Sequence, residues 1–252
     1  MSDFKEEIVS TKEIRKRTIK AFVVFFVLIA LAVSGWKWLN RQPTDNGIPK
    51  PIRSVLDAND NIFTNYIFSD YNLSKAYLPS EVPARTRLNG DIGTPDNFDT
   101  ASWKLQLIRA VGDTQLISLA EIKALPQTEV IFDFKCVEGW SQITRWEGVK
   151  FSDFVKKYGL EQQASLKYVG LYTPDNQYYV GIDTKSMLQP QTILCYEING
   201  RPLPMNQGAP LRLIIPVKYG IKHLKRIGTI FFSNQRPPDY WFERGYDYHA
   251  GL

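Results

Sequence analysis

One long apolar run stands apart from the pattern of the rest of the chain. From Ala21 to Trp36 the sequence reads AFVVFFVLIALAVSGW, and the next charged residue is Lys37. A helix of this composition approaches the thickness of a membrane, and the flanking Trp and Lys side chains suit a membrane edge. We expect a transmembrane anchor over residues 21–39. A cleaved signal segment and a buried globular helix are the alternatives.

The residues before this run are polar and include a basic cluster, which comprises Lys12, Arg15, Lys16, Arg17 and Lys20. Positive charge on the N-terminal side predicts that residues 1–20 are a cytoplasmic tail. An anchor and a signal segment would both export the remainder. We therefore expect a single N-terminal pass in the cell membrane, with the main domain on the periplasmic or extracytoplasmic side. The stretch RKRTIKAF loosely resembles a twin-arginine export signal, although positive-inside charge explains it equally well.

The hydropathy pattern of the remaining chain is that of short strands with a few short helices. Residues 40–60 contain Pro and Asn and are predicted to be a linker, and residues 61–252 the folded domain. SLAEIKALP predicts a helix with a Ser118–Glu121 capping box, and the strand-like segments are WKLQLIRAVGD, EVIFDFKC, KYVGLY, YYVGID, ILCYEING and LRLIIP. We predict a mixed α+β fold, strand-rich with short helices, preceded by one N-terminal hydrophobic helix.

Composition adds two constraints on function. The net charge of +5 is modest and falls partly in the N-terminal cluster, so nucleic acid is not an expected partner. Aromatic residues make up 13% of the chain, which favours a cleft that takes a flat ligand. Neither a nucleotide-binding glycine motif nor a hydrolase signature is present in the sequence.

The chain has two cysteines, Cys136 and Cys195, and no CxxC pair. Cys195 is interpreted as a small buried apolar residue, and one disulfide between the two remains an alternative. Cys136 follows an apolar strand and precedes Glu138-Gly139-Trp140, so its sulfur lies where a strand gives way to a loop. A thiolate is a soft ligand, and at neutral pH it is stabilised by neighbouring positive charge or by a bound metal. From these residues alone, a functional role for Cys136 is no better supported than a structural role as a small buried side chain.

The segment KALPQTEVIFDFKCVEGWSQITRWEGVKFSDFV resembles the core motif of the sulfite-oxidase-type molybdopterin-dependent oxidoreductases. Three further blocks resemble the family in the same order: CYEINGRPLP, NQGAPLRLIIPVKYGIKHLKRIGTI and PPDYWFERGYDYHAGL. The CVEGW sequence is most similar to that of the bacterial members that reduce methionine sulfoxide in periplasmic proteins. The resemblance runs, with gaps, from about Asn89 to the C-terminus.

The resemblance implies a molybdopterin cofactor carrying molybdenum, with Cys136 as the catalytic residue and the protein's own ligand to the metal. It implies cofactor contacts from Asn89, Gly90, Asp91, Thr173, Gln207, Arg212, His223, Leu224 and Lys225, with Lys225 near the phosphate. Gln207 stands where bacterial relatives tend to carry Asn, and the alignment at residues 89–91 is loose.

Ordinary structural interpretations stand beside these assignments. Arg212 alternates with leucines, which is typical of a solvated strand face. Lys222, Lys225 and Arg226 could form a basic surface turn, and His223 any satisfied imidazole. The aromatic tail residues are more often packing than ligand contacts, and they comprise Tyr240, Trp241, Tyr246, Tyr248 and His249.

Together these features predict an exported molybdenum enzyme that moves two electrons by oxygen-atom transfer on a small, sulfur-containing substrate. The sequence has no haem-attachment motif, so we expect a separate electron-transfer partner such as a cytochrome. The alternative is a binding or assembly module that uses the same fold without molybdenum.

Overall fold

The computed structural model describes residues 10–67, 69, 73–90 and 92–251 of the chain. By its internal contacts the chain divides into two compact units, Met1–Val55 and Leu56–Leu252. Asp91, one of the predicted cofactor contacts, lies outside the described residues.

The first unit is dominated by helix α1 (Thr11–Asn40), which includes the basic cluster as well as the apolar run. Ser10 caps this helix by accepting a hydrogen bond from the backbone N–H of Glu13. None of its side chains is buried, and it is long and apolar enough to cross a membrane. The predicted hydrophobic helix is thus present, and it begins well before Ala21.

The stretch predicted as a linker contains regular structure. Strands β1 (Thr44–Asp45) and β2 (Ile48–Pro49) form a short hairpin, whose Asn46-Gly47 turn has two positive φ angles. This is the backbone that a two-residue hairpin loop requires. Helix α2 (Lys50–Ile62) follows at once and continues into the π-helical turn η1 (Phe63–Ile67).

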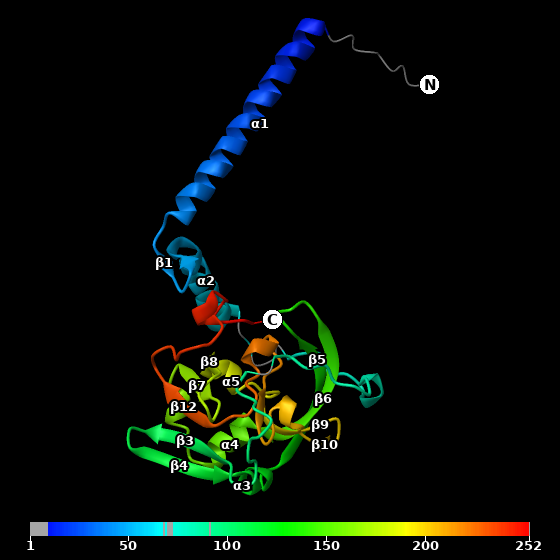
Figure 1. The fold of residues 1–252 in the computed structure, drawn as a ribbon, viewed down its shortest axis with the longest axis vertical. Coiled ribbons are helices and arrows are strands. Elements are labelled where there is room, and N and C mark those ends of the chain that lie inside the picture. Colours follow the sequence, from blue (N-terminus) through cyan, green and yellow to red (C-terminus); the bar gives the residue numbers. More distant parts are fainter. Residues whose placement is uncertain (1–9, 68, 70–72, 91, 252) are drawn as a thin grey trace. The chain divides into compact units, whose positions relative to one another are not determined.

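The second unit contains two sheets (Figure 1). One has the order β4-β3-β12-β7-β8, in which β12 runs parallel to β3 and all other neighbours are antiparallel. Trp103, Leu105 and Leu107, which alternate along the strand-like segment WKLQLIRAVGD, are all buried. The strands of this sheet are β3 (Lys104–Ala110), β4 (Asp113–Ser118), β7 (Tyr168–Tyr172), β8 (Tyr179–Asp183) and β12 (Thr229–Ser233).

The other sheet has the order β10-β9-β6-β5, with β11 also paired to β9. At Gly148 strands β6 and β9 approach so closely that an added Cβ would lie 2.2 Å from the carbonyl oxygen of Leu194. The strands are β5 (Gln127–Lys135), β6 (Ser141–Lys150), β9 (Ile193–Ile198), β10 (Arg201–Pro202) and β11 (Arg212–Ile214).

Short helices connect these strands. The Ser118–Glu121 capping box forms as predicted, because each residue's side chain bonds to the other's backbone N–H. The α-helices are α3 (Leu119–Lys123), α4 (Phe151–Lys157) and α5 (Thr184–Met187). The 3-10 turns are η2 (Pro79–Glu81), η3 (Gln163–Ser165), η4 (Met205–Gln207), η5 (Gly220–Lys222) and η6 (Phe242–Arg244). The mixed, strand-rich fold with short helices is therefore confirmed.

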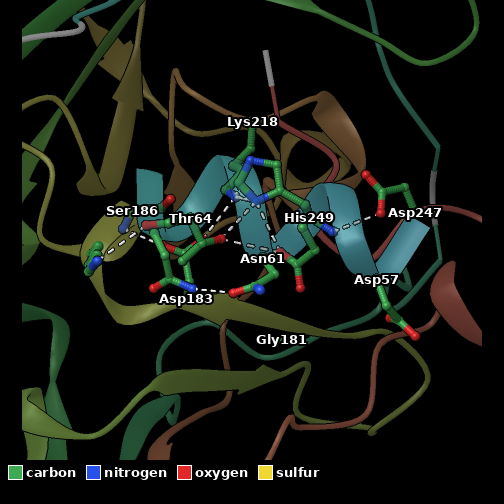
Figure 2. A network of polar contacts seen from close by, with 12 residues as sticks. Asp57, Asn61, Thr64, Gly181, Asp183, Ser186, Lys218, Asp247 and His249 are labelled. Carbon is green, nitrogen blue, oxygen red and sulfur yellow. Dashed lines mark hydrogen bonds and ion pairs between the residues drawn. The ribbon is translucent and has the colours of Figure 1, made fainter. Parts of the chain in front are cut away.

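The interior of the second unit also holds charged side chains. Lys218 pairs with Asp183 at 2.9 Å, and both are almost fully buried. The ammonium of Lys218 also lies 3.0 Å from the Nδ1 atom of His249 (Figure 2). A second buried pair joins Lys222 to Asp239 at 2.5 Å. The basic residues after Tyr219 are therefore part of the interior, and the surface-turn interpretation of Lys222, Lys225 and Arg226 is wrong.

Candidate cofactor site

A cavity of about 130 Å³ lies at the end of β5. It is built by the β5–β6 turn, residues 89, 90 and 92, the η5 segment and the aromatic tail. Its lining residues are Asn89, Gly90, Ile92, Cys136, Val137, Glu138, Tyr178, Gly220, Ile221, His223, Lys225, Trp241 and Tyr246. Segments far apart in the sequence therefore meet around Cys136.

The position of Cys136 follows from the turn that ends β5. Its backbone N–H donates to the carbonyl of Trp140, and the turn is completed by Gly139 at φ +85°. A positive φ favours glycine, so the EGW sequence fixes this sharp turn. Cys136 thus stands at the strand-to-loop boundary, as predicted. It is only 6% exposed, packs against the smaller of two hydrophobic clusters and still lines the cavity.

The electrostatics of Cys136 suit a metal ligand better than a free nucleophile. Burial raises the pKa of its thiol, and the nearby carboxylate of Glu138 raises it further. The protein alone therefore keeps the sulfur protonated at neutral pH, whereas a bound metal ion would deprotonate it. Cys136 and Cys195 are both free thiols in the described chain, so the alternative of a disulfide is not realised.

His223 contributes a neutral ring to the cavity wall. Its Nδ1 atom accepts a hydrogen bond from the backbone N–H of Ile215, and Nε2 lies 3.1 Å from the carbonyl oxygen of Lys218. Burial, reinforced by the charge of Arg212, lowers the pKa of His223 to about 3. Both ring nitrogens are thus occupied by backbone groups, and the imidazole cannot serve as a proton donor near neutral pH.

Arg212 lies behind this wall and is fully buried, so the interpretation as a solvated strand face is wrong. Its guanidinium donates to the backbone carbonyl and the side-chain oxygen of Gln207, at 3.1 and 2.8 Å, and stacks over the ring of Trp146. Burial lowers the pKa of Arg212 to about 10, which leaves it charged at neutral pH. Its buried Nε atom has no hydrogen-bond partner within the described residues.

Lys225 lines the cavity between the loop that contains Gly90 and the η4 turn. Its ammonium donates to the carbonyl oxygens of Gly90, at 2.6 Å, and Asn206, at 2.9 Å. The lysine thereby ties the residue-90 loop to the η4 turn. A positive charge surrounded by backbone carbonyls at a cavity wall is a suitable neighbour for an anion.

The structure brings some of the predicted cofactor contacts together and not others. Asn89, Gly90, Cys136, His223 and Lys225 line the cavity, and Gln207 and Arg212 form a layer behind His223.

Besides Gln207 and Arg212, two further predicted contacts do not line this cavity. Leu224 packs in the larger hydrophobic cluster. Thr173 donates to Asp175 and packs closely against Gly93.

Sequence reasoning missed the aromatic part of the wall. Tyr178 donates to the carbonyl of Ile221 at 2.5 Å, and burial strongly raises the pKa of its hydroxyl. Trp241 and Tyr246 stack edge to face with ring centroids 5.0 Å apart. The density of aromatic residues in the tail was the available signal. Their assignment to packing alone was incomplete, because both rings also line the cavity.

Residues 91–241 match the family described as oxidoreductase molybdopterin binding domain. The chain belongs to this family. It is a molybdenum-dependent oxidoreductase of the sulfite-oxidase type, and its cofactor is molybdopterin with molybdenum.

Three relatives illustrate the range of similarity. A putative protein-methionine-sulfoxide reductase subunit, YedZ1 of Azospira oryzae, is 34% identical over 194 residues, which cover 76% of this chain and 73% of that protein. The uncharacterized oxidoreductase YuiH of Bacillus subtilis is 32% identical, over 62% of this chain and 77% of YuiH. The protein-methionine-sulfoxide reductase catalytic subunit MsrP of Campylobacter jejuni is 29% identical over 60% of this chain, and the match spans 55% of MsrP.

A solved structure shares the fold. The sulfane dehydrogenase SoxCD from Paracoccus pantotrophus superposes with a TM-score of 0.50 and 14% sequence identity, over 56% of this chain and 40% of that chain. At this identity the likeness supports the fold alone.

The residues at the cavity fit the family's cofactor. A free thiol beside a cavity provides a soft ligand for molybdenum. The ammonium of Lys225 at the cavity wall is chemically suited to a phosphate. Arg212 adds positive charge in the layer behind His223, and its buried Nε atom has no hydrogen-bond partner within the described residues. The flat rings of Trp241 and Tyr246 provide an apolar boundary.

Proposed function

We propose that this protein is an exported, membrane-tethered molybdenum enzyme that transfers an oxygen atom to or from a small sulfur-containing substrate. The observation that carries the proposal is the free thiol of Cys136 at a cavity whose surroundings are cationic and aromatic. When bound, molybdopterin supplies the two-electron redox chemistry at its metal. The protein's contribution is to bind this group, orient it and exclude water.

In this proposal each residue has a definite part. Cys136 provides the protein thiolate to molybdenum. The ring of His223 forms part of the cavity wall and stays neutral near neutral pH, so it does not exchange a proton there. Lys225 and Arg212 balance the phosphate charge, Lys225 beside the cavity and Arg212 from the layer behind His223. Asn89 and Gly90 contact the pterin from the N-terminal loop, and Asp91, Thr173, Gln207 and Leu224 complete the proposed set.

The remaining proposals concern the site of action and the partners. We propose a basic tail at 1–20, an anchor at 21–39, a linker at 40–60 and a catalytic domain at 61–252 on the periplasmic or extracytoplasmic side. The division into compact units at Val55 and Leu56 supports a boundary in this region. Electrons pass to or from a separate partner such as a cytochrome, which a tether would hold at high effective concentration.

The experiment compares Cys136→Ser with Cys195→Ala as a matched control. The full chain is expressed with molybdate, and molybdenum, released pterin, sulfoxide reduction and sulfite oxidation are measured. We expect turnover to be lost only in Cys136→Ser, because Cys195 is fully buried away from the cavity. Wild-type protein without molybdenum or pterin, or full turnover in Cys136→Ser, would overturn the proposal. Protease accessibility of the domain in spheroplasts tests export separately.

A further inference from the structure

The helix that leads into the second unit presents its polar side to the protein. In the part of α2 that belongs to this unit, and in η1, Asp57, Asp60 and Thr64 lie on one side. Arg236 donates to Asp57 and to Asp60, each at 2.7 Å. The ring of His249 lies 3.3 Å from Asp60 and 3.4 Å from the hydroxyl of Thr64 (Figure 2). These contacts fix the rotation of the helical segment about its axis.

The opposite side of the same segment is apolar and exposed. Tyr66 is 80% exposed, and Ile62 and Ile67 are each close to half exposed. We call these three residues the outer stripe. Phe63 is not part of it, because its ring stacks on that of His249 with centroids 5.8 Å apart. Ordinary surface helices bury their apolar side and expose their polar side. This segment does the reverse, and a contiguous group of exposed large apolar side chains marks a contact surface.

The course of the chain indicates what covers the outer stripe. Helix α1, the candidate membrane span, ends at Asn40, and α2 begins at Lys50. The nine residues between them reach at most about 30 Å when extended, and their pairing as β1 and β2 shortens that reach. From Lys50, the helix carries the chain only about 18 Å further to Ile62. The outer stripe therefore follows the membrane exit within a short length of chain.

From these observations we propose that the outer stripe lies in the headgroup layer of the membrane that α1 crosses. Aliphatic side chains beside Tyr suit this layer, because an aromatic ring can enter the acyl boundary while its hydroxyl stays hydrated. The inference rests on the proposed membrane anchoring. It adds a second contact between protein and bilayer, made by the catalytic unit itself.

The test measures the depth of a spin label in the full chain. Tyr66→Cys and, as the matched control, Val111→Cys are labelled and reconstituted in vesicles of phosphatidylethanolamine and phosphatidylglycerol. Both positions are highly exposed, so neither label disturbs the core, and wild type labelled in parallel gives the background of Cys136 and Cys195. Collision rates with lipid-soluble oxygen and with a water-soluble nickel chelate are then compared.

We expect the label at position 66 to collide more with oxygen and several-fold less with the nickel chelate than the label at 111. Equal nickel-chelate collision at both positions, in protein that floats with the vesicles, would refute the inference. Dipolar broadening at position 66 that disappears on dilution with unlabelled protein would also refute it, because a second copy would then cover the stripe. Failure of the protein to float would instead reject the anchoring.

Discussion

The buried pair of Lys218 and Asp183 offers a quantitative test of how the second unit is held together. The two side chains are 2% and 7% exposed, and their charged atoms are 2.9 Å apart. Asp183 also accepts a hydrogen bond from the N–H of Ser186 as the cap of α5. Asp183→Asn removes the negative charge, while Asn remains a good capping residue. The substitution therefore isolates the ion pair from the cap.

The expected loss follows from burial. An exposed ion pair contributes at most about 1 kcal/mol, whereas removing one partner of a buried pair costs about 3–5 kcal/mol. We expect the lower end, about 3 kcal/mol, because the ammonium of Lys218 keeps His249 as a neighbour at 3.0 Å. This corresponds to a more than hundredfold change in the unfolding equilibrium. The assay is urea unfolding of the full chain in mild detergent, followed by circular dichroism.

The pH dependence of the same pair has a definite sign. Burial alone would raise the pKa of Asp183, but the ammonium of Lys218 and the N–H of Ser186 hold it below its usual value of 3.8. A carboxyl group with a lowered folded-state pKa stabilises the protein above the unfolded-state pKa. That contribution is lost as pH falls through the folded-state pKa. Wild type should therefore lose more stability than Asp183→Asn on acidification below about pH 4.

The double variant Asp183→Asn/Lys218→Met is the control. It removes both charges, so it should be more stable than the sum of the two single losses predicts. If Asp183→Asn costs less than about 1 kcal/mol, or the double variant loses the full sum, the pair is not the buried, coupled interaction described above.

Three further predictions concern the cavity and its sheet. Gly148→Ala should destabilise the protein by about 2 kcal/mol or more, read as a lower melting temperature, because the new Cβ would lie 2.2 Å from the Leu194 carbonyl oxygen. His223 should remain neutral to about pH 4 in NMR titration, because its pKa in the folded protein is about 3. As pH drops below about 6.5 the unfolded chain takes up a proton on this residue and the folded protein does not, so the stability of the fold decreases. Titration of His223 near pH 6.5 in the folded protein would contradict its buried position. Arg212→Met should lower pterin retained per folded protein by about tenfold or more, and unchanged retention would remove Arg212 from the proposed phosphate site.

Local signals in the sequence predicted much of the fold. The capping box at Ser118 depends on residues three apart, and the strand before Cys136 on a run of neighbouring apolar residues, so both could be predicted directly from the sequence. The position of Cys136 at the end of a strand did not distinguish a functional cysteine from a buried one, and only the family resemblance favoured the functional role. Helix α2 was missed because Pro and Asn near its start suggested a linker, and its apolar side does not face a core.

The interior placement of the cations could not be read from local pattern. Lys222 is buried because Asp239, from the loop after β12, pairs with it, and the guanidinium of Arg212 is covered by the ring of Trp146 from β6. Such partners are recognisable only once the topology brings the segments together. The same reason explains the missed ring of Tyr178, which reaches the cavity from β7–β8 turn residues far from Cys136 in the chain.

The described C-terminal segment has a consequence for the order of synthesis and folding. Tyr248 is buried against Gly181 and Lys222, and Gly251 bridges to Lys218. The unit's interior is therefore incomplete until residues 248–251 have emerged from the ribosome. We therefore expect folding of this unit to be completed only after this segment has been translated.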